Sequence, residues 1–260
     1  KNEKDFNKIK SRKNSFDPEK YKVSQNFVSS SDGTQIPYFL ISKNNLPLNG
    51  KNPTILYGYG GFQISKPPSY LGKSIAEYWL EAGGVYVVSN IRGGGEFGPD
   101  WHQSALKENR QRAYDDFIAI AMDLINKKIT SPEHLGIEGR SNGGLLVGAT
   151  FTQRPDLFDA VICGVPLLDM YRYDKLLAGA SWVDEYGDPD IPEEWDFISK
   201  YSPYQNLKDD TEYPEVFFYT STKDDRVHPG HARKMAKKMT DMGSSVVYYE
   251  NTEGGHAGTS

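Results

Sequence analysis

Short apolar runs alternate with longer amphipathic stretches along most of this chain. The apolar runs are typical of buried strands, and the stretches between them carry helical periodicity. The pattern predicts strands at residues 54–57, 85–89, 135–138, 159–164, 215–221 and 245–250, and helices near 72–82, 111–127, 145–150 and 230–242. This alternation indicates an α/β fold in which a mostly parallel sheet is covered by helices on both faces.

Three regions depart from this alternation. Residues 22–41 contain two predicted strands around a turn at Ser31-Asp32-Gly33. Residues 167–206 are rich in Tyr, Trp, Pro and Asp, and we expect them to form an insertion that shapes a substrate pocket. Residues 1–20 are polar and lysine-rich, and we interpret them as a linker or an incoming segment. This leaves residues 21–260 as one predicted domain.

The most informative short segment is Gly139-Arg140-Ser141-Asn142-Gly143-Gly144, which has the form Gly-x-Ser-x-Gly. It lies between a predicted strand and a predicted helix, as does the nucleophile elbow of serine hydrolases. The glycines allow a strained backbone that pushes the hydroxyl of Ser141 outward. The alternative is a glycine-rich turn with an incidental serine, which the flanking strand and helix disfavour.

A serine hydroxyl needs a base and an acid that orients the base. In this type of site the chain order is Ser, then Asp or Glu, then His. His256 follows the last predicted strand on a glycine-rich loop and is the favoured base. His228 is its competitor because it shares a loop with the candidate acid. His231 begins a basic predicted helix, and we expect it to face solvent or cap a turn.

Two adjacent carboxylates, Asp224 and Asp225, follow the predicted strand 215–221. Either could hold the imidazole in the right tautomer and stabilise its charged form. The residue pattern alone does not separate them. The alternative is a solvated acidic turn in which one aspartate caps the next helix.

The developing oxyanion of an acyl transfer needs hydrogen-bond donors. One is the backbone N–H of Asn142, the residue after the nucleophile. The second is expected from the loop Gly58-Tyr59-Gly60-Gly61-Phe62, where Tyr59, or Tyr57 before it, could donate a phenolic O–H. This loop lacks the Lys-Ser/Thr ending of a Walker phosphate loop, so we do not interpret it as a nucleotide site.

Five segments together resemble the catalytic domain of the prolyl oligopeptidase family, and the resemblance covers residues 21–260. They are Tyr57-Gly58-Tyr59-Gly60-Gly61-Phe62, Arg92-Gly93-Gly94-Gly95-Glu96-Phe97-Gly98, Gly139-Arg140-Ser141-Asn142-Gly143-Gly144, Asp224-Asp225-Arg226-Val227 and Gly255-His256-Ala257. The resemblance implies an α/β-hydrolase fold and a serine peptidase that cuts short peptides after proline through an acyl-enzyme. It implies Ser141 as nucleophile, Asp224 as acid and His256 as base, with Tyr59 and the Asn142 backbone at the oxyanion.

The same resemblance implies a pocket for the proline ring. That ring is flat and apolar, so a suitable pocket is aromatic and uncharged. Trp182 matches a tryptophan that stacks on the ring, and Phe62, Tyr186 and Val227 match other pocket walls. Arg226 matches an arginine that binds a substrate backbone carbonyl.

Other functions stay open at this point. A related oligopeptidase cuts after arginine or lysine and has a glutamate where this chain has Trp182, but Asp184 and Glu185 lie close by. A carboxylesterase on the same fold is a further alternative. A hydrolase fold that binds without turnover is the alternative outside enzymes, and the combination of serine, acid, histidine and oxyanion loop argues against it.

Composition agrees with a folded domain of 260 residues, 37% of them apolar and 25% charged, without a membrane span. The net charge of −5 without a basic stripe argues against a nucleic-acid partner. The single cysteine, Cys163, excludes an internal disulfide and is expected in the core. No cofactor or metal is expected, because no His/Cys cluster has metal-binding spacing. The expected partners are short peptides, and the oligomeric state is not predicted.

Members of the resembling family also carry a β-propeller domain that limits access to short peptides. This sequence shows no propeller repeat and begins without Met. We therefore expect a fragment, or the ordered part, of a longer chain. The expected location is the cytoplasm, and the periplasm stays open because the true N-terminus is expected to be missing.

Overall fold

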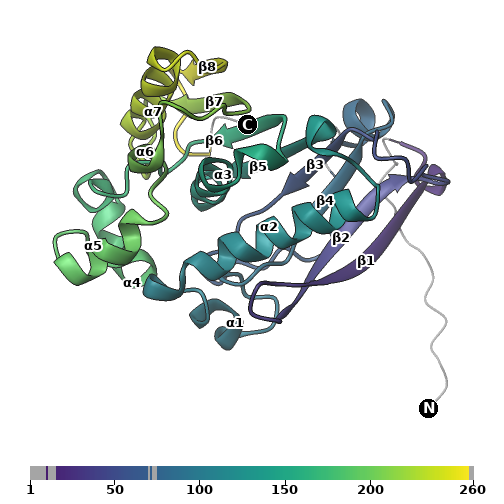
Figure 1. Cartoon of the computed structure of the whole chain (residues 1–260), viewed down its shortest axis with the longest axis horizontal. Coiled ribbons are helices and arrows are strands. Elements are labelled where there is room, and N and C mark those ends of the chain that lie inside the picture. Colours follow the sequence, from purple (N-terminus) through teal and green to yellow (C-terminus); the bar gives the residue numbers. More distant parts are fainter. Residues whose placement is uncertain (1–9, 11–15, 70, 72–74, 258–260) are drawn as a thin grey trace.

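A single eight-stranded sheet organises the computed structural model, which describes residues 10, 16–69, 71 and 75–257 (Figure 1). The strand order is β1-β2-β4-β3-β5-β6-β7-β8. The strands are β1 Tyr21–Ser29, β2 Gln35–Lys43, β3 Thr54–Tyr57, β4 Val85–Ser89, β5 Leu135–Arg140, β6 Ala160–Gly164, β7 Glu215–Ser221 and β8 Val246–Asn251. The β1–β2 and β2–β4 pairs are antiparallel and the other pairs are parallel, which confirms the mostly parallel sheet.

The helical segments lie between the strands as the alternating pattern predicts. The α-helices are α1 Pro99–Gln103, α2 Gln111–Asn126, α3 Asn142–Gln153, α4 Val183–Tyr186, α5 Pro192–Ser199, α6 Pro203–Asn206 and α7 Gly230–Asp241. Short 3₁₀ turns are η1 Pro18–Lys20, η3 Lys107–Asn109, η4 Pro132–His134, η5 Pro155–Leu157, η6 Tyr173–Lys175 and η7 Gly179–Trp182. Among the described residues no helix is both long and apolar enough to cross a membrane.

The two faces of the sheet are covered unequally. The larger core lies under α2, α3 and α7, where Phe117, Leu146 and Met235 pack with Leu56 and Phe218 from the strands. The long helix α2 shows why: its buried residues recur three or four positions apart, which gives it one apolar stripe.

The other face carries a smaller core around Ile41, Leu80 and Tyr86. Its cover is η2 (Ile75–Leu80), a π-helical segment in the place of the predicted helix near 72–82. Residues 72–74 of that prediction lie outside the described residues, as do residues 1–9 and 11–15 of the predicted N-terminal segment.

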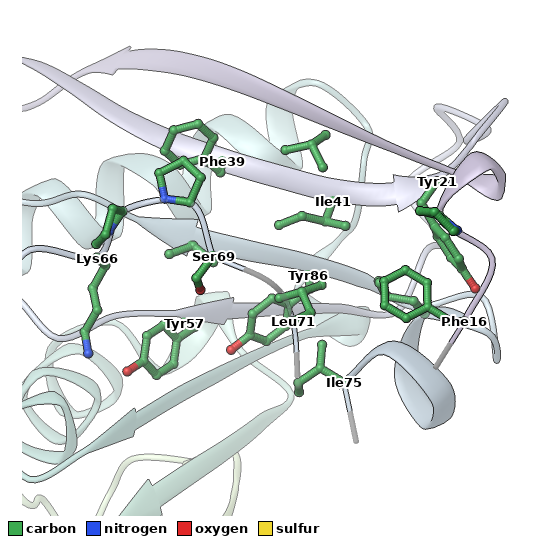
Figure 2. Close-up of a pocket in the computed structure, with 16 residues that line it drawn as sticks. Phe16, Tyr21, Phe39, Ile41, Tyr57, Lys66, Ser69, Leu71, Ile75 and Tyr86 are labelled. Atoms are coloured by element: carbon green, nitrogen blue, oxygen red, sulfur yellow. The ribbon is translucent and has the colours of Figure 1, made fainter. Parts of the chain in front are cut away.

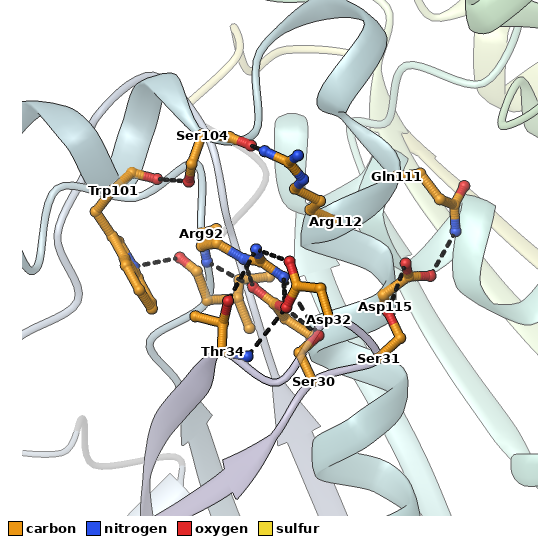
Figure 3. A network of polar contacts seen from close by, with 12 residues as sticks. Ser30, Ser31, Asp32, Thr34, Arg92, Trp101, Ser104, Gln111, Arg112 and Asp115 are labelled. Carbon is orange, nitrogen blue, oxygen red and sulfur yellow. Dashed lines mark hydrogen bonds and ion pairs between the residues drawn. The ribbon is translucent and has the colours of Figure 1, made fainter.

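A buried arginine fastens the antiparallel end of the molecule (Figure 3). Arg92 follows β4, and its guanidinium makes two parallel hydrogen bonds to Asp116 of α2, at 2.9 and 2.7 Å. It also contacts Asp32, in the turn between β1 and β2, at 2.5 Å. Asp116 is fully buried. The network therefore joins the β1–β2 hairpin to the long helix through charge.

The predicted insertion, residues 167–206, contains η6, η7, α4, α5 and α6. It packs against η3, the turn that precedes α2. Cys163 on β6 is fully buried, as predicted, and burial raises the pKa of its thiol. It is therefore a core residue.

Candidate active site

Ser141 occupies a sharp turn between β5 and α3. Its φ of 58° and ψ of −118° are a strained combination for a residue with a Cβ atom. A Cβ atom on Gly139 would lie 2.0 Å from the carbonyl oxygen of Gly143, so only glycine fits where the strand meets the helix. The turn has the backbone that a nucleophile elbow requires.

The structure brings Asp224 and His256 together from two neighbouring strands. Asp224 follows β7 and His256 follows β8, and Oδ2 of Asp224 lies 2.8 Å from Nδ1 of His256. Oδ1 of Asp224 accepts the backbone N–H groups of Arg226 and Val227, each at 2.9 Å. Asp225 is exposed and accepts the backbone N–H of His256 at 3.4 Å. The geometry thus separates the two aspartates that the residue pattern left open.

The electrostatics of Asp224 suit a residue that stays ionised. Burial alone would raise its pKa, but the hydrogen bonds from His256, Arg226 and Val227 outweigh burial, and the pKa is lowered. An ionised Asp224 keeps the proton of His256 on Nδ1. Nε2 of His256 is then the nitrogen that can accept a proton.

The loop that carries His256 is tied to the elbow. Nη2 of Arg140, the residue before Ser141, donates to the carbonyl oxygen of His256 at 3.3 Å. His228, the competing base, instead accepts the backbone N–H of Gly230 on Nδ1 at the start of α7. Of the histidines after the serine, His256 is the one that the structure joins both to the acid and to the elbow.

We expected His231 to face solvent or to cap a turn, and the expectation of solvent exposure is wrong. His231 is buried, and its Nδ1 accepts the backbone N–H groups of Leu168 and Asp169, at 3.3 and 3.1 Å. Burial lowers its pKa to about 4, so the ring is neutral at pH 7. A neutral imidazole offers the acceptor that this loop needs.

The two candidate oxyanion donors lie at the elbow and in the loop after β3. Asn142 is the first residue of α3, so its backbone N–H has no acceptor within the helix. Burial raises the pKa of Tyr59, so its hydroxyl stays protonated and can donate. Tyr57, the other tyrosine considered, lines a cavity on the opposite face of the sheet.

The predicted pocket residues form an aromatic cluster. The ring of Phe62 meets Trp182 and Tyr186 edge to face, with centroids 6.4 and 5.7 Å apart. Trp182 is 9% exposed, whereas Tyr186 has no exposed surface. Val227 is buried and Arg226 is exposed beside Asp224. Tyr186 is therefore a buried support of Phe62 and has no surface to offer a ligand.

Glu185 is one of the two carboxylates that left a cationic substrate possible, and it is already paired within the protein. Its Oε1 accepts from Nη1 of Arg110 at 2.8 Å and from the backbone N–H of Phe62 at 2.9 Å. Its Oε2 accepts from Nε2 of His102 at 2.7 Å. The other carboxylate, Asp184, is exposed. A substrate guanidinium would have to displace the chain's own arginine.

Arg110 and His102 were not predicted as site residues. They lie 75 and 83 positions from Glu185 in the sequence, and neither belongs to a recognisable short motif. A long-range ion pair leaves no local periodicity, so only the folded structure reveals this group.

A cavity of about 540 Å³ lies on the opposite face of the sheet (Figure 2). Its wall is mostly aromatic and aliphatic, and Lys66 extends along one end toward Tyr57. Ser141, Asp224 and His256 do not line it. It is therefore separate from the candidate triad.

Within the part of the chain that the structure describes, one cluster of three carboxylates is compact enough to hold a cation. Its members are Asp174, Asp188 and Asp190. The ammonium of Lys175 already pairs with Asp190 at 2.6 Å and with Asp174 at 3.3 Å. The cluster lies in the insertion and shares no residue with the triad.

Comparison with known proteins identifies relatives across nearly the whole chain. The sequence model of the prolyl oligopeptidase family matches residues 72–260. An uncharacterized peptidase of Sinorhizobium fredii is 57% identical over 96% of this chain, and the prolyl endopeptidase of Elizabethkingia meningoseptica is 47% identical over 86% of it. The matched parts are 34% and 32% of those two relatives, so the chain spans about a third of their length.

Solved structures agree with the sequence comparison. A post-proline cleaving enzyme from Rickettsia typhi superimposes with a TM-score of 0.93 at 48% identity. The match covers 96% of this chain and 36% of that one.

Proposed function

This chain belongs to the prolyl oligopeptidase family, and we propose that it supplies the serine peptidase domain of an enzyme that hydrolyses short peptides on the carboxyl side of proline. The observation that carries the proposal is the 2.8 Å hydrogen bond between Asp224 and His256. The loop that carries His256 is in turn hydrogen-bonded to Arg140, beside the strained turn at Ser141. The fold is the α/β-hydrolase fold, as the sequence predicted.

The proposed reaction begins with attack of the Ser141 hydroxyl oxygen on the carbonyl carbon of the proline residue itself. Nε2 of His256 takes the hydroxyl proton and then delivers it to the leaving amine. Asp224 stays ionised and stabilises the imidazolium that forms between these steps. Water then attacks the acyl-enzyme by the same route and restores Ser141.

Negative charge develops on the carbonyl oxygen in both halves of the reaction. The backbone N–H of Asn142 and the hydroxyl of Tyr59 are the proposed donors to it. A donor of this kind typically contributes about 2.7–4 kcal/mol to the transition state. The partial positive charge at the start of α3 adds to their effect.

The aromatic cluster supports proline over a cationic residue at the cleavage position. Phe62 and Trp182 present apolar rings to a flat, apolar side chain. Glu185, which a substrate arginine would need, is occupied by Arg110. Relatives named as prolyl endopeptidases favour the same choice.

The test is hydrolysis of two chromogenic peptides, one ending in proline and one in arginine, by wild-type protein and the Ser141→Ala variant. We expect wild type to cleave the proline peptide and Ser141→Ala to lose about a million-fold in kcat. Equal low turnover by both proteins would exclude catalysis at Ser141, and cleavage after arginine alone would exclude the proline assignment. Labelling of Ser141 by a fluorophosphonate separates an enzyme from a binding module.

The pocket is tested in the same assay with Trp182→Ala. We expect turnover of the proline peptide to fall about tenfold or more, because the ring loses its aromatic partner. Hydrolysis of a small acetyl ester should change little. Trp195→Ala removes a tryptophan of the same insertion that packs on Tyr171 and serves as the matched control. Equal losses on both substrates would mean that Trp182 only packs.

A further inference from the structure

Arg110 is fully buried between the elbow and the loop after β3. Its Nη2 donates to Oδ1 of Asn142 at 2.6 Å, and its Nη1 donates to Oε1 of Glu185 at 2.8 Å. We propose that Arg110 and Glu185 are a positioning pair that sets the distance between the two oxyanion donors. This inference rests on the proposed acyl transfer at Ser141, but not on the preference for proline.

The first arm of the pair acts through the side chain of Asn142. Oδ1 of Asn142 accepts from Arg110 and also from the hydroxyl of Tyr186 at 2.7 Å. Because two donors point at this atom, the amide cannot flip, and its Nδ2 must face the other way. Nδ2 donates to the backbone carbonyl of Tyr59 at 2.5 Å. The guanidinium thus contacts Asn142, which carries one oxyanion donor, and reaches Tyr59, which carries the other, through the Asn142 amide.

The second arm acts through Glu185 on the pocket wall. Oε1 of Glu185 accepts the backbone N–H of Phe62, three residues after Tyr59. The fork of one guanidinium therefore holds both ends of the Tyr59–Phe62 loop. His102 occupies the remaining oxygen of Glu185 and keeps its carboxylate oriented.

The Tyr59–Phe62 loop depends on these contacts because its backbone is not regular. Gly60 and Phe62 have φ values of 61° and 54°, in the left-handed region. The loop also passes directly against the pair: a Cβ atom on Gly61 would lie 2.5 Å from Nδ2 of Asn142 and 3.0 Å from Nη2 of Arg110. A side chain at this position would force the loop away from the elbow.

Loss of the guanidinium should therefore loosen the loop without removing either donor. Oxyanion donors act only within about 2.7–3.1 Å of the developing charge. A small shift of Tyr59 reduces the stabilisation of the transition state in every acyl transfer at Ser141, whatever the acyl group. The effect belongs in kcat and is shared by peptide and ester, unlike that of Trp182→Ala.

The experiment compares Arg110→Met with wild type on the proline peptide and on a small acetyl ester. Rates are expressed per active site titrated with a fluorophosphonate, so that loss of folded protein does not count. We expect kcat to fall about 10- to 100-fold on both substrates, with KM for the ester unchanged. Arg110→Lys should give a smaller loss, because an ammonium cannot make the two-armed contact. If Arg110→Met does not fold, Arg110→Lys carries the test alone.

A double-mutant cycle on the ester shows whether Arg110 acts through Asn142. In an Asn142→Ala background, which keeps the backbone N–H, Arg110→Met should cause a smaller loss than in wild type, because only the arm through Glu185 is left to lose. Arg92→Lys, a change at the other buried arginine, should lower stability and leave kcat per titrated site unchanged. The proposal is overturned if Arg110→Met or Arg110→Lys retains kcat within twofold, or if the two losses multiply in the cycle. A wild type that hydrolyses the ester and not the proline peptide would contradict the proposed specificity alone.

Discussion

Two buried arginines support different parts of this molecule. Arg92 lies at the antiparallel end of the sheet and is held by Asp116 and Asp32, so two carboxylates face one guanidinium. Arg110 lies beneath the site and has one carboxylate, Glu185, which it shares with His102. Arg92 joins a hairpin to a helix, whereas Arg110 joins a loop to the elbow.

The difference lies in how completely each charge is satisfied. Hydrogen bonds from Arg92 reach Asp116, Asp32, Thr34 and Ser30 (Figure 3). In the described structure Nε of Arg110 is buried without a hydrogen-bond partner. Such an unmet donor costs stability. We infer that the surroundings of Arg92 favour stability and those of Arg110 favour position.

The largest effect that tests this comparison is expected from Arg92→Met. Removing the guanidinium leaves Asp116 as an uncompensated buried charge, which should lower the free energy of unfolding by about 3–5 kcal/mol. Urea unfolding measures the loss, and active-site titration should show unchanged kcat in the folded fraction. A loss below about 1 kcal/mol would remove the distinction between the two arginines, because Arg92 would then contribute little to stability.

The sequence predicted the sheet, most of its helices and the residues of the proposed triad. These features follow from short-range signals: apolar periodicity, glycine at a sharp turn and the chain order of serine, acid and histidine. The support beneath the site was not predictable in this way. Arg110 meets Asn142 and Glu185 across 32 and 75 positions, and a single arginine among polar neighbours resembles a solvent-facing residue.

The burial of His231 was indicated by its position in the helical repeat, but the basic composition of the helix was given more weight. His231 begins a basic helix, and this charge led to the expectation of exposure. The helical spacing places His231 on the same face as Met235 and Met239, four and eight residues later, and all three are buried. Position around the helix, which periodicity encodes, decided its burial, and the composition of the helix did not.

His231 gives a second, intermediate test, because it is a basic group buried without its charge. Its folded pKa of about 4 lies below the ordinary value of 6.5, so the unfolded state binds more protons between these values. Stability therefore falls as pH decreases from 6.5 toward 4. We expect a contribution of about 2 kcal/mol to the loss between pH 7 and pH 5.

The measurement is the free energy of unfolding at both pH values for wild type and His231→Asn. The amide oxygen of Asn can still accept a hydrogen bond but does not titrate, so this part of the slope should disappear. His134→Asn, the same change at an exposed histidine, should leave the slope unchanged. An undiminished slope in His231→Asn would show that this ring is protonated in the folded protein. His231 would then be buried in its charged form, as the two arginines are.

The smallest effect is expected at a solvent-exposed ion pair that has the same two-bond geometry as Arg92 and Asp116. Arg154 makes two parallel hydrogen bonds to Asp156, at 2.8 and 2.7 Å, with side chains that are 36% and 60% exposed. Solvent screens such a pair, so Arg154→Met should lower the free energy of unfolding by less than about 1 kcal/mol. The loss should vanish in 1 M NaCl, where charges are screened within about 3 Å. The loss in Arg92→Met should persist there, since its partner Asp116 is buried. Equal losses in the two variants would mean that paired geometry, and not burial, sets the contribution of an arginine in this protein.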